Sequence, residues 1–270
     1  MTNTRHGKGH IQDRLDPRDL KTDDLIAAVQ GQTALFQVPG WGPAASSSNL
    51  TSYVKEMWQQ GESEACVGFA LARACDMRGF VQGFDDMEAP SPFAIWALAR
   101  MFEKQLVEPL QNVGCQPRNA CAMAQKWGLC PWSRWPSEMK NALIAPSPDM
   151  LSQASPYRTS SYFALEGADR AELVREALTA RVPVCVALQV DKTFNEFTGS
   201  HVMSEFDSTY LGGHYVTIIG HQDDAFLICN SWGTEWGFGG FAWITENRLL
   251  HPTTSNLRAV LVAPNIEEAA

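Results

Sequence analysis

The two halves of this 270-residue chain carry different hydrophobic patterns, and this segregation constrains the fold more than any other feature. Before about residue 165, apolar residues favour helices, over residues 66–77, 93–102 and 119–127. After an amphipathic helix over residues 168–180, the apolar runs have strand length, at 184–190, 215–219, 226–230 and 241–244. Helices followed by strands predict an α+β fold with two lobes.

A polar arm, residues 1–37, precedes these lobes, which are expected to span residues 38–165 and 166–270. The arm has scattered apolar positions and only weak helical character, over residues 23–29. We expect it to be flexible or to lie on the surface, with a regulatory role left open. His6 and His10 stand beside glycines in this arm, and we expect them to be solvated.

The charge balance restricts the classes of partner. Lys and Arg total 21 against 30 Asp and Glu, which gives a net charge of −9. Nucleic acid and anionic membranes are not expected partners, because both require a basic surface. The amino terminus has no signal-peptide pattern, and no later apolar run reaches the length of a bilayer span. A cytoplasmic location is the default expectation. Non-classical export, association with a virion and the oligomeric state are left open.

Seven cysteines, an odd number, require at least one thiol without a partner in the chain. Cys66 has a chemical reason to be free, because it stands at a predicted helix start, where unpaired amides and the helix dipole favour a thiolate. Gln60 lies six residues upstream across a loop, so its side-chain amide can reach the same place. Cys115, Cys121 and Cys130 do not have the paired spacing of a zinc site, and no metal or organic cofactor is expected.

A histidine and an asparagine stand at the ends of neighbouring strands. His214 opens one strand and Asn230 ends the next, 16 residues later, with a turn at 222–224 between them. A hairpin folded at this turn brings the two side chains together. The asparagine oxygen can then hold one imidazole nitrogen and leave the other to face a thiol. Trp232 is expected to cover this bond and, with Gly213, which leaves room beside the imidazole, to contact the substrate.

These segments resemble the papain-like cysteine peptidases. In that family a Q-G-x-C-G-S-C-W-A-F motif carries an oxyanion glutamine and the nucleophile, and N-S-W-G-x-x-W-G carries the orienting asparagine. Residues 60–69 and 230–237 follow these motifs, and His214 lies 148 residues after Cys66. The resemblance covers about residues 38–250 and implies a divergent member, of prokaryotic or viral type. It implies a helical lobe and an antiparallel barrel-like lobe, with the active site in the cleft between them.

The resemblance is incomplete around the nucleophile. Ser63 replaces a family cysteine, which implies that Cys115 has lost its disulfide partner, and Val67 replaces the family's tryptophan. Pro117 and Arg118 stand where the family has two glycines that pair with the substrate backbone. Because proline has no amide proton, the usual pairing with substrate is not expected here.

The resemblance implies a cysteine peptidase that hydrolyses peptide bonds through a thioester. Cys66 is the nucleophile, with His214 as base and acid. Asn230 orients the imidazole, Gln60 stabilises the oxyanion, and the substrate is a peptide or protein. Two alternatives remain open. One is a dedicated acyl-transfer enzyme, such as a deamidase, a transglutaminase or a maturation protease for one partner. The other is a catalytically idle papain-like module that only binds.

Overall fold

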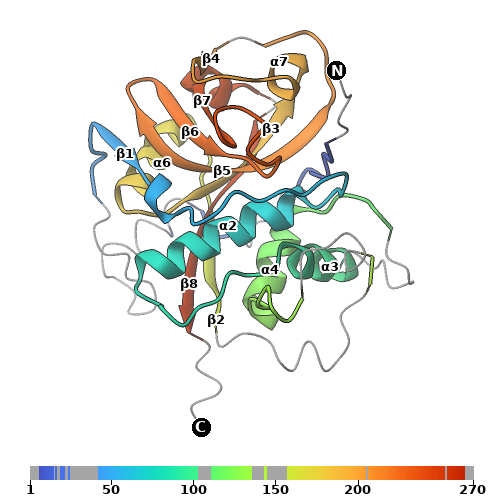
Figure 1. The fold of residues 1–270 in the computed structure, drawn as a ribbon. Helices are drawn as coiled ribbons and strands as arrows, with labels where there is room; N and C mark the ends of the chain where they lie inside the picture. Colours follow the sequence, from blue (N-terminus) through green and yellow to red (C-terminus); the bar gives the residue numbers. More distant parts are fainter. Residues whose placement is uncertain are drawn as a thin grey trace.

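The helices and strands separate into two lobes, as the hydrophobic patterns predict (Figure 1). The computed structural model describes residues 6–14, 16, 19–21, 24, 42–102, 111–135, 143–144, 157–204, 206–252 and 254–264, and the weak helix predicted over 23–29 lies almost wholly outside them. Each lobe has its own apolar core, one beneath α2 and one inside the curved sheet. The α+β prediction is confirmed.

The helical lobe is built from three helices: α2 (Cys66–Val81), α3 (Pro92–Phe102) and α4 (Pro117–Trp127). α3 begins as predicted, because the Ser91 hydroxyl accepts a hydrogen bond from the Ala94 amide at 3.2 Å. α2 and α3 approach closely at Gly68, where an added Cβ would lie 2.2 Å from the Pro92 carbonyl oxygen. The small side chains of α2 therefore permit this packing.

Two of these helices differ in extent from the prediction. α2 continues four residues beyond the predicted end at residue 77, to Val81. α4 begins with Pro117 in its first turn, two residues before the predicted start, and stops at Gly128, whose φ is 85°. Pro117 therefore starts a helix, a position at which a missing amide proton has no structural cost.

The strand-rich lobe is an eight-stranded sheet in the order β2-β8-β3-β5-β6-β7-β4, with β1 paired to β5. The strands are β1 (Ser47–Asn49), β2 (Tyr157–Ala164), β3 (Val184–Val190), β4 (Val202–Met203), β5 (Gly212–Gln222), β6 (Ala225–Cys229), β7 (Phe241–Thr245) and β8 (Ser255–Pro264). The short helices are η1 (Thr51–Tyr53), α6 (Arg170–Thr179), α7 (Lys192–Asn195) and α8 (Glu246–Leu250). β5 and β6 form the predicted antiparallel hairpin, which turns at Asp223 with a positive φ of 51°.

Two long strands were not predicted from the sequence. β2 and β8 pair with each other, and they run on from the strand-rich lobe past α2 (Figure 1). β8 contacts α2, and β2 contacts α4, so the sheet supports both lobes. The boundary expected between the two lobes, near residue 165, falls at the end of β2. It would assign β2 to the helical lobe, although β2 belongs to the sheet.

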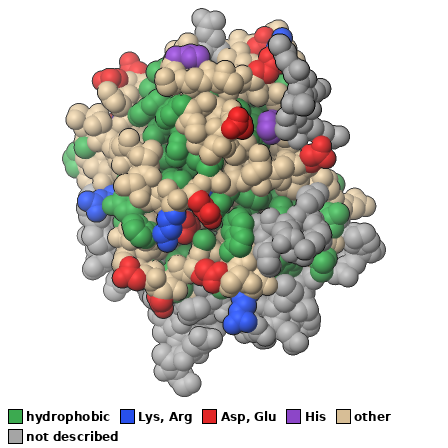
Figure 2. Space-filling model, in the orientation of Figure 1, with side chains coloured by type: hydrophobic (Ala, Val, Ile, Leu, Met, Phe, Trp, Pro, Cys, Tyr) green, Lys and Arg blue, Asp and Glu red, His purple; other side chains and the backbone are tan. Residues whose placement is uncertain are grey.

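Among the described helices, none is both long enough and apolar enough to cross a membrane. All seven cysteines lie in the described part of the chain, where they are buried and form no disulfide. On the face shown in Figure 2, the described acidic and basic side chains are interspersed.

A buried ion pair fastens α7 and α8 beside the sheet. Asp191 is fully buried and pairs with Arg248, which is 2% exposed. Asp191 also accepts hydrogen bonds from the Phe194 amide, at 2.7 Å, and from the Asp207 amide, at 3.1 Å. Phe194 packs edge-on against the His214 ring. The ion pair therefore supports the wall behind the imidazole.

Asp191→Asn should destabilise the fold strongly. The substitution leaves the Arg248 charge buried without its counter-ion, and the expected loss in free energy of unfolding is about 3–5 kcal/mol. Urea unfolding followed by circular dichroism measures this loss. Asp223→Asn is the matched control, because this exposed turn residue has a positive φ that asparagine also tolerates, and its effect should stay within about 0.5 kcal/mol. Equal losses in the two variants would contradict this account.

Candidate active site

The start of α2 meets β5 at the junction of the two lobes. Cys66 is the first residue of α2, and it is fully buried. The helix is held to the sheet at Ala70, whose carbonyl oxygen accepts hydrogen bonds from the Thr217 hydroxyl at 3.0 Å and the Cys185 thiol at 3.4 Å. These bonds place the amino end of α2 beside the start of β5, which carries His214.

His214 and Asn230 meet as the hairpin predicts. The imidazole Nε2 lies 2.8 Å from Asn230 Oδ1, and the Ser231 amide donates to the same oxygen at 2.8 Å. The bond from the Ser231 amide identifies Oδ1 as the acceptor oxygen of the Asn230 side chain. Because this oxygen can only accept, the imidazole carries its proton on Nε2. The Trp232 ring stacks on the imidazole with centroids 4.5 Å apart, and it is 1% exposed. His214 Nδ1 is buried and has no hydrogen-bond partner among the described atoms.

Gln60 is connected to this pair through Ser231. The Ser231 hydroxyl donates to the side-chain oxygen of Gln60, Oε1, at 2.6 Å. The backbone amide of Gln60 donates to the Ser231 carbonyl at 2.8 Å. These bonds direct the Gln60 side-chain nitrogen toward the start of α2, where it donates to the Ser63 carbonyl at 2.7 Å. Sequence reasoning did not identify Ser231, and its place in the N-S-W-G segment was the available signal.

Gly9 and its neighbours in the arm lie in the cleft between the lobes, whereas Ile11 and several other described positions of the arm are exposed. The Gly9 carbonyl accepts from the Cys115 amide at 2.9 Å, and the Ile11 amide donates to the Cys115 carbonyl at 3.2 Å. On the opposite side, Gly9 forms a parallel bridge with Gly213. The arm therefore runs as a short strand between the two lobes. On the helical side, this backbone pairing is made by Cys115 and not by Pro117 or Arg118.

Glycines allow the arm to pass this close to the residues that precede α2. An added Cβ at Gly7 would lie 1.8 Å from the Ser63 carbonyl oxygen, and one at Gly9 would lie 1.7 Å from that of Glu64. On the cleft wall, a Cβ at Gly114 would lie 2.0 Å from the Gly9 carbonyl oxygen. Such close approach of backbone to backbone is possible only without side chains. The alternating glycines at 7 and 9 were the sequence signal for this contact.

The two histidines of the arm are packed against the cleft, so the expectation that they are solvated is wrong. His6 stacks on Trp232 with centroids 4.4 Å apart and an interplanar angle of 8°. His10 stacks on Tyr215 at 5.9 Å and accepts a hydrogen bond from Asn256 Nδ2 at 2.8 Å. Burial lowers the pKa of His10 to about 4. His10 is therefore bound as a neutral ring.

The Gly7 carbonyl of the arm accepts a hydrogen bond from the side-chain amide of Gln60. Gln60 Nε2 donates to this oxygen at 3.2 Å. The backbone amide of Gly9 faces the Cys66 thiol, as does that of Tyr215. The arm therefore contacts both the thiol and the amide expected to stabilise an oxyanion.

The buried pair is neutral in this arrangement. Burial raises the pKa of Cys66 to about 12, although the facing amides of Tyr215, Gly9 and Val67 oppose the shift. Burial also lowers the pKa of His214 to about 3, against the effect of its bond to Asn230. The thiolate expected from the helix start is thus absent here, because exclusion of water outweighs the amides and the helix dipole.

Known proteins resemble this chain in sequence and in fold. The papain family cysteine protease profile matches residues 97–259, a range that contains His214 and Asn230 and begins after Cys66. An uncharacterized peptidase C1-like protein of Acanthamoeba polyphaga mimivirus is 25% identical over 254 residues, 86% of this chain and 79% of the viral protein. A cathepsin L-like proteinase of Fasciola hepatica is 25% identical over 73% of this chain and 59% of its own length.

Among solved structures, xylellain, a cysteine protease from Xylella fastidiosa, has the same fold. It superposes with a TM-score of 0.77 over 97% of this chain and 98% of its own, at 20% identity. The family profile covers more than half of the chain, and the fold extends over nearly all of it. The chain belongs to the papain family of cysteine proteases.

Proposed function

We propose that the protein hydrolyses peptide bonds with Cys66 as nucleophile, His214 as proton carrier, Asn230 as orienting residue and Gln60 as oxyanion donor. The observation that carries this proposal is the 2.8 Å contact between His214 Nε2 and Asn230 Oδ1, in the wall that faces the first turn of α2. The contact fixes the imidazole proton on Nε2 and leaves Nδ1 as the basic nitrogen.

The reaction follows from these positions. His214 Nδ1 takes the proton of the Cys66 thiol, and the sulfur attacks the substrate carbonyl carbon. The oxygen of the tetrahedral intermediate accepts hydrogen bonds from Gln60 Nε2 and the Cys66 amide, each contributing about 3–4 kcal/mol. The imidazolium returns its proton to the leaving amine and a thioester forms. Water, deprotonated by the same nitrogen, then releases the acid.

The docked arm keeps this machinery idle. The Gly7 carbonyl holds Gln60 Nε2, and burial leaves Cys66 and His214 uncharged. A substrate must therefore displace residues 6–14 before its own carbonyl can reach the thiol. Gly213, which we propose lines the substrate site, lies under His10, where an added Cβ would be 3.0 Å from His10 Nδ1. We propose that Trp232, on which His6 stacks while the arm is docked, is a second residue of the substrate site.

Displacing the arm should expose Cys66 to thiol reagents. Gly9→Ala forces a Cβ into the Glu64 carbonyl, so the arm must move away from the thiol. We expect alkylation of Cys66 by iodoacetamide at pH 7.5, followed by peptide mass spectrometry, to become about tenfold faster or more. Gly42→Ala is the control, because nothing lies within 4 Å of its added Cβ. If Cys66 of the unsubstituted protein is alkylated as fast as Cys66 of the Gly9→Ala variant, docking of the arm is refuted.

Hydrolysis should depend on Cys66 and not on the neighbouring buried thiol. In the Gly9→Ala background, Cys66→Ala is expected to lower kcat/KM on a fluorogenic peptide library by about 10³-fold or more, because no other group can form the thioester. Cys75→Ala, on the same helix and equally buried, should retain most of the activity. Persistent hydrolysis in Cys66→Ala would overturn the proposal.

The same assay separates the alternatives. Mass spectrometry of the products distinguishes new peptide termini from ammonia release or amide exchange on an intact chain, which would indicate a deamidase or a transglutaminase. Cleavage confined to one sequence of the library would indicate a maturation protease. An idle binding module would cleave nothing after the arm is displaced, and a thiol-directed epoxide would leave its Cys66 unlabelled.

Acid should weaken docking of the arm. The docked pKa of His10, about 4, lies below its ordinary value of 6.5, so docking is fully stabilised above pH 6.5 and weakens as the pH falls toward 4. Between pH 7.5 and 4.5 the effect amounts to roughly 70-fold in the docking equilibrium. Hydrogen exchange of residues 6–14, corrected for intrinsic rates, measures it. His10→Gln, which keeps an acceptor for Asn256, should weaken the pH dependence. Equal protection at both pH values would contradict this prediction.

A further inference from the structure

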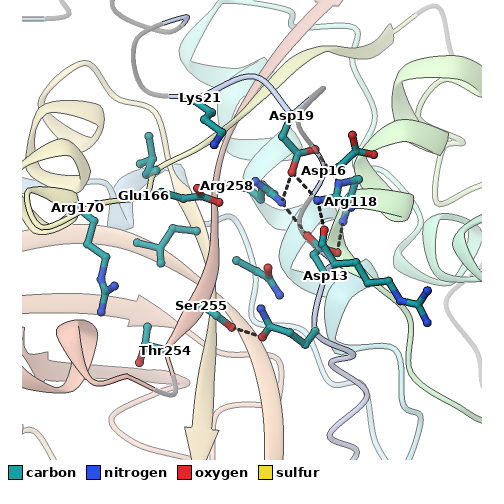
Figure 3. A pocket seen from close by; sticks show the side chains of 16 residues that line it. Asp13, Asp16, Asp19, Lys21, Arg118, Glu166, Arg170, Thr254, Ser255 and Arg258 are labelled. Carbon is teal, nitrogen blue, oxygen red and sulfur yellow. Dashed lines mark hydrogen bonds and ion pairs between the residues drawn. The ribbon is translucent and has the colours of Figure 1, made fainter.

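Beyond the nucleophile, the arm ends its passage through the cleft at two arginines. The Asp13 carboxylate pairs with Arg258 of β8 at 2.8 Å and accepts from the Arg118 backbone amide at 3.1 Å. Arg118, in the first turn of α4, holds Asp19 with two hydrogen bonds, the one from Nε measuring 2.7 Å. Asp19 also lies 3.3 Å from Arg258. The two carboxylates and the two guanidinium groups form one network (Figure 3).

This network is built into the wall of the cleft rather than spread over its surface. Arg258 is 2% exposed and Asp13 is 3% exposed in their side chains, and Asp19 is 9% exposed. Arg118 presents a fork whose two nitrogens match the two oxygens of one carboxylate. The backbone amide of Arg118, at the start of α4, adds a third donor group. A planar anion with two oxygens is the chemical group that fits these donors.

The position along the arm connects this network to the nucleophile. The Gly9 amide faces the Cys66 thiol, and Asp13 follows four residues later. Four residues of extended chain reach at most about 14 Å. A peptide of ordinary length that lies over Cys66 therefore also reaches Arg118 and Arg258. The arm is itself a peptide in the cleft, and it contacts both the Cys66 thiol and the two arginines at the same time.

A cavity of about 420 Å³ adjoins the network and gives access to it. Arg170 lies across this cavity from the network and points away from it (Figure 3). Its guanidinium donates to the Leu250 carbonyl at 2.6 Å instead of to the arm. Arg118 and Arg258 are thus distinguished from a third arginine of the same cavity by their contact with carboxylates.

We propose that Arg118 and Arg258 form a carboxylate-binding subsite of the cleft, which Asp13 and Asp19 fill while the arm is docked and which an acidic residue of a bound peptide fills when the arm is displaced. The inference rests on the proposed function, because it assumes that peptides bind over Cys66. It assigns a preference for acidic peptides to a chain that is itself acidic, with a net charge of −9. It also makes the acidic peptide a direct competitor of the arm.

The subsite is tested by binding, separately from hydrolysis. The full chain carries Asp13→Asn and Asp19→Asn to empty the subsite, and Cys66→Ala to prevent turnover. The probes are fluorescein-labelled nonapeptides in two matched pairs, with Asp or Asn placed four residues before or after the central residue. Fluorescence polarisation gives the dissociation constants, and circular dichroism verifies folding.

The Asp peptide of one pair should bind about tenfold more tightly or better than its Asn partner, as expected for charge-assisted bonds. Arg118→Gln or Arg258→Gln, added to this chain, should reduce the ratio to less than about twofold, whereas Arg170→Gln should preserve it. Asp and Asn peptides that bind equally in both pairs, or that both fail to bind, would overturn the proposal. So would a ratio that survives both substitutions.

A second background guards against loss of folding. If the double Asp→Asn chain is unfolded, the same pairs are measured on Gly9→Ala with Cys66→Ala, in which the arm is displaced and its carboxylates are kept. The ratio is then smaller because the arm competes, but it should still depend on Arg118 and Arg258 and not on Arg170. Hydrolysis by the chain with Cys66 intact is scored independently, so that failure of the peptidase proposal and failure of this subsite give different results.

Discussion

Exclusion of water from the contact between α2 and β5 determines the protonation states of Cys66 and His214. Cys66 and His214 both lie fully buried there, and burial raises the pKa of the thiol to about 12 and lowers that of the imidazole to about 3. A thiolate and an imidazolium would stabilise each other, but each must lose its hydration in such a place. The arm completes the wall that keeps water out. We therefore expect the position of the arm to decide whether the pair is charged.

The arm is held by contacts spread over both lobes. Its backbone bonds to Cys115 on the helical side and bridges Gly213 on the strand side. Asp13 and Asp19 then fasten it to β8 and α4. Gln60 and Ser231 connect the same two lobes directly, through a 2.6 Å hydrogen bond. We therefore expect displacement of the arm to remove one cross-connection and to leave the bond between Gln60 and Ser231, so that the proposed catalytic residues keep their places.

The parts predictable from sequence were those with local signals. The turn between β5 and β6 and the spacing of its two ends were sufficient to bring His214 to Asn230. Ser91 and Gly128 marked a helix start and a helix end in the same way. β2 and β8 were missed because their pairing joins segments about a hundred residues apart, and neither segment shows a strong alternation by itself.

The arm was missed for a different reason. Its polar composition is typical of a solvated terminus, and its docking depends on Gly7 and Gly9 meeting carbonyls from residues 63 and 64, a complementarity visible only in three dimensions. The ionisation of Cys66 could not be predicted either. The helix start favours a thiolate, and only the folded chain shows that burial outweighs it.

The protonation state of His214 tests this account most directly. Nitrogen-15 NMR of imidazole-labelled intact protein reports both the charge of the ring and the nitrogen that carries the proton. We expect a neutral ring with its proton on Nε2, unchanged between about pH 5 and 8, because burial holds the pKa of His214 near 3 and Asn230 accepts from Nε2. A doubly protonated His214 at neutral pH in the intact chain would contradict it, since that state requires a thiolate at Cys66 and a cleft open to water.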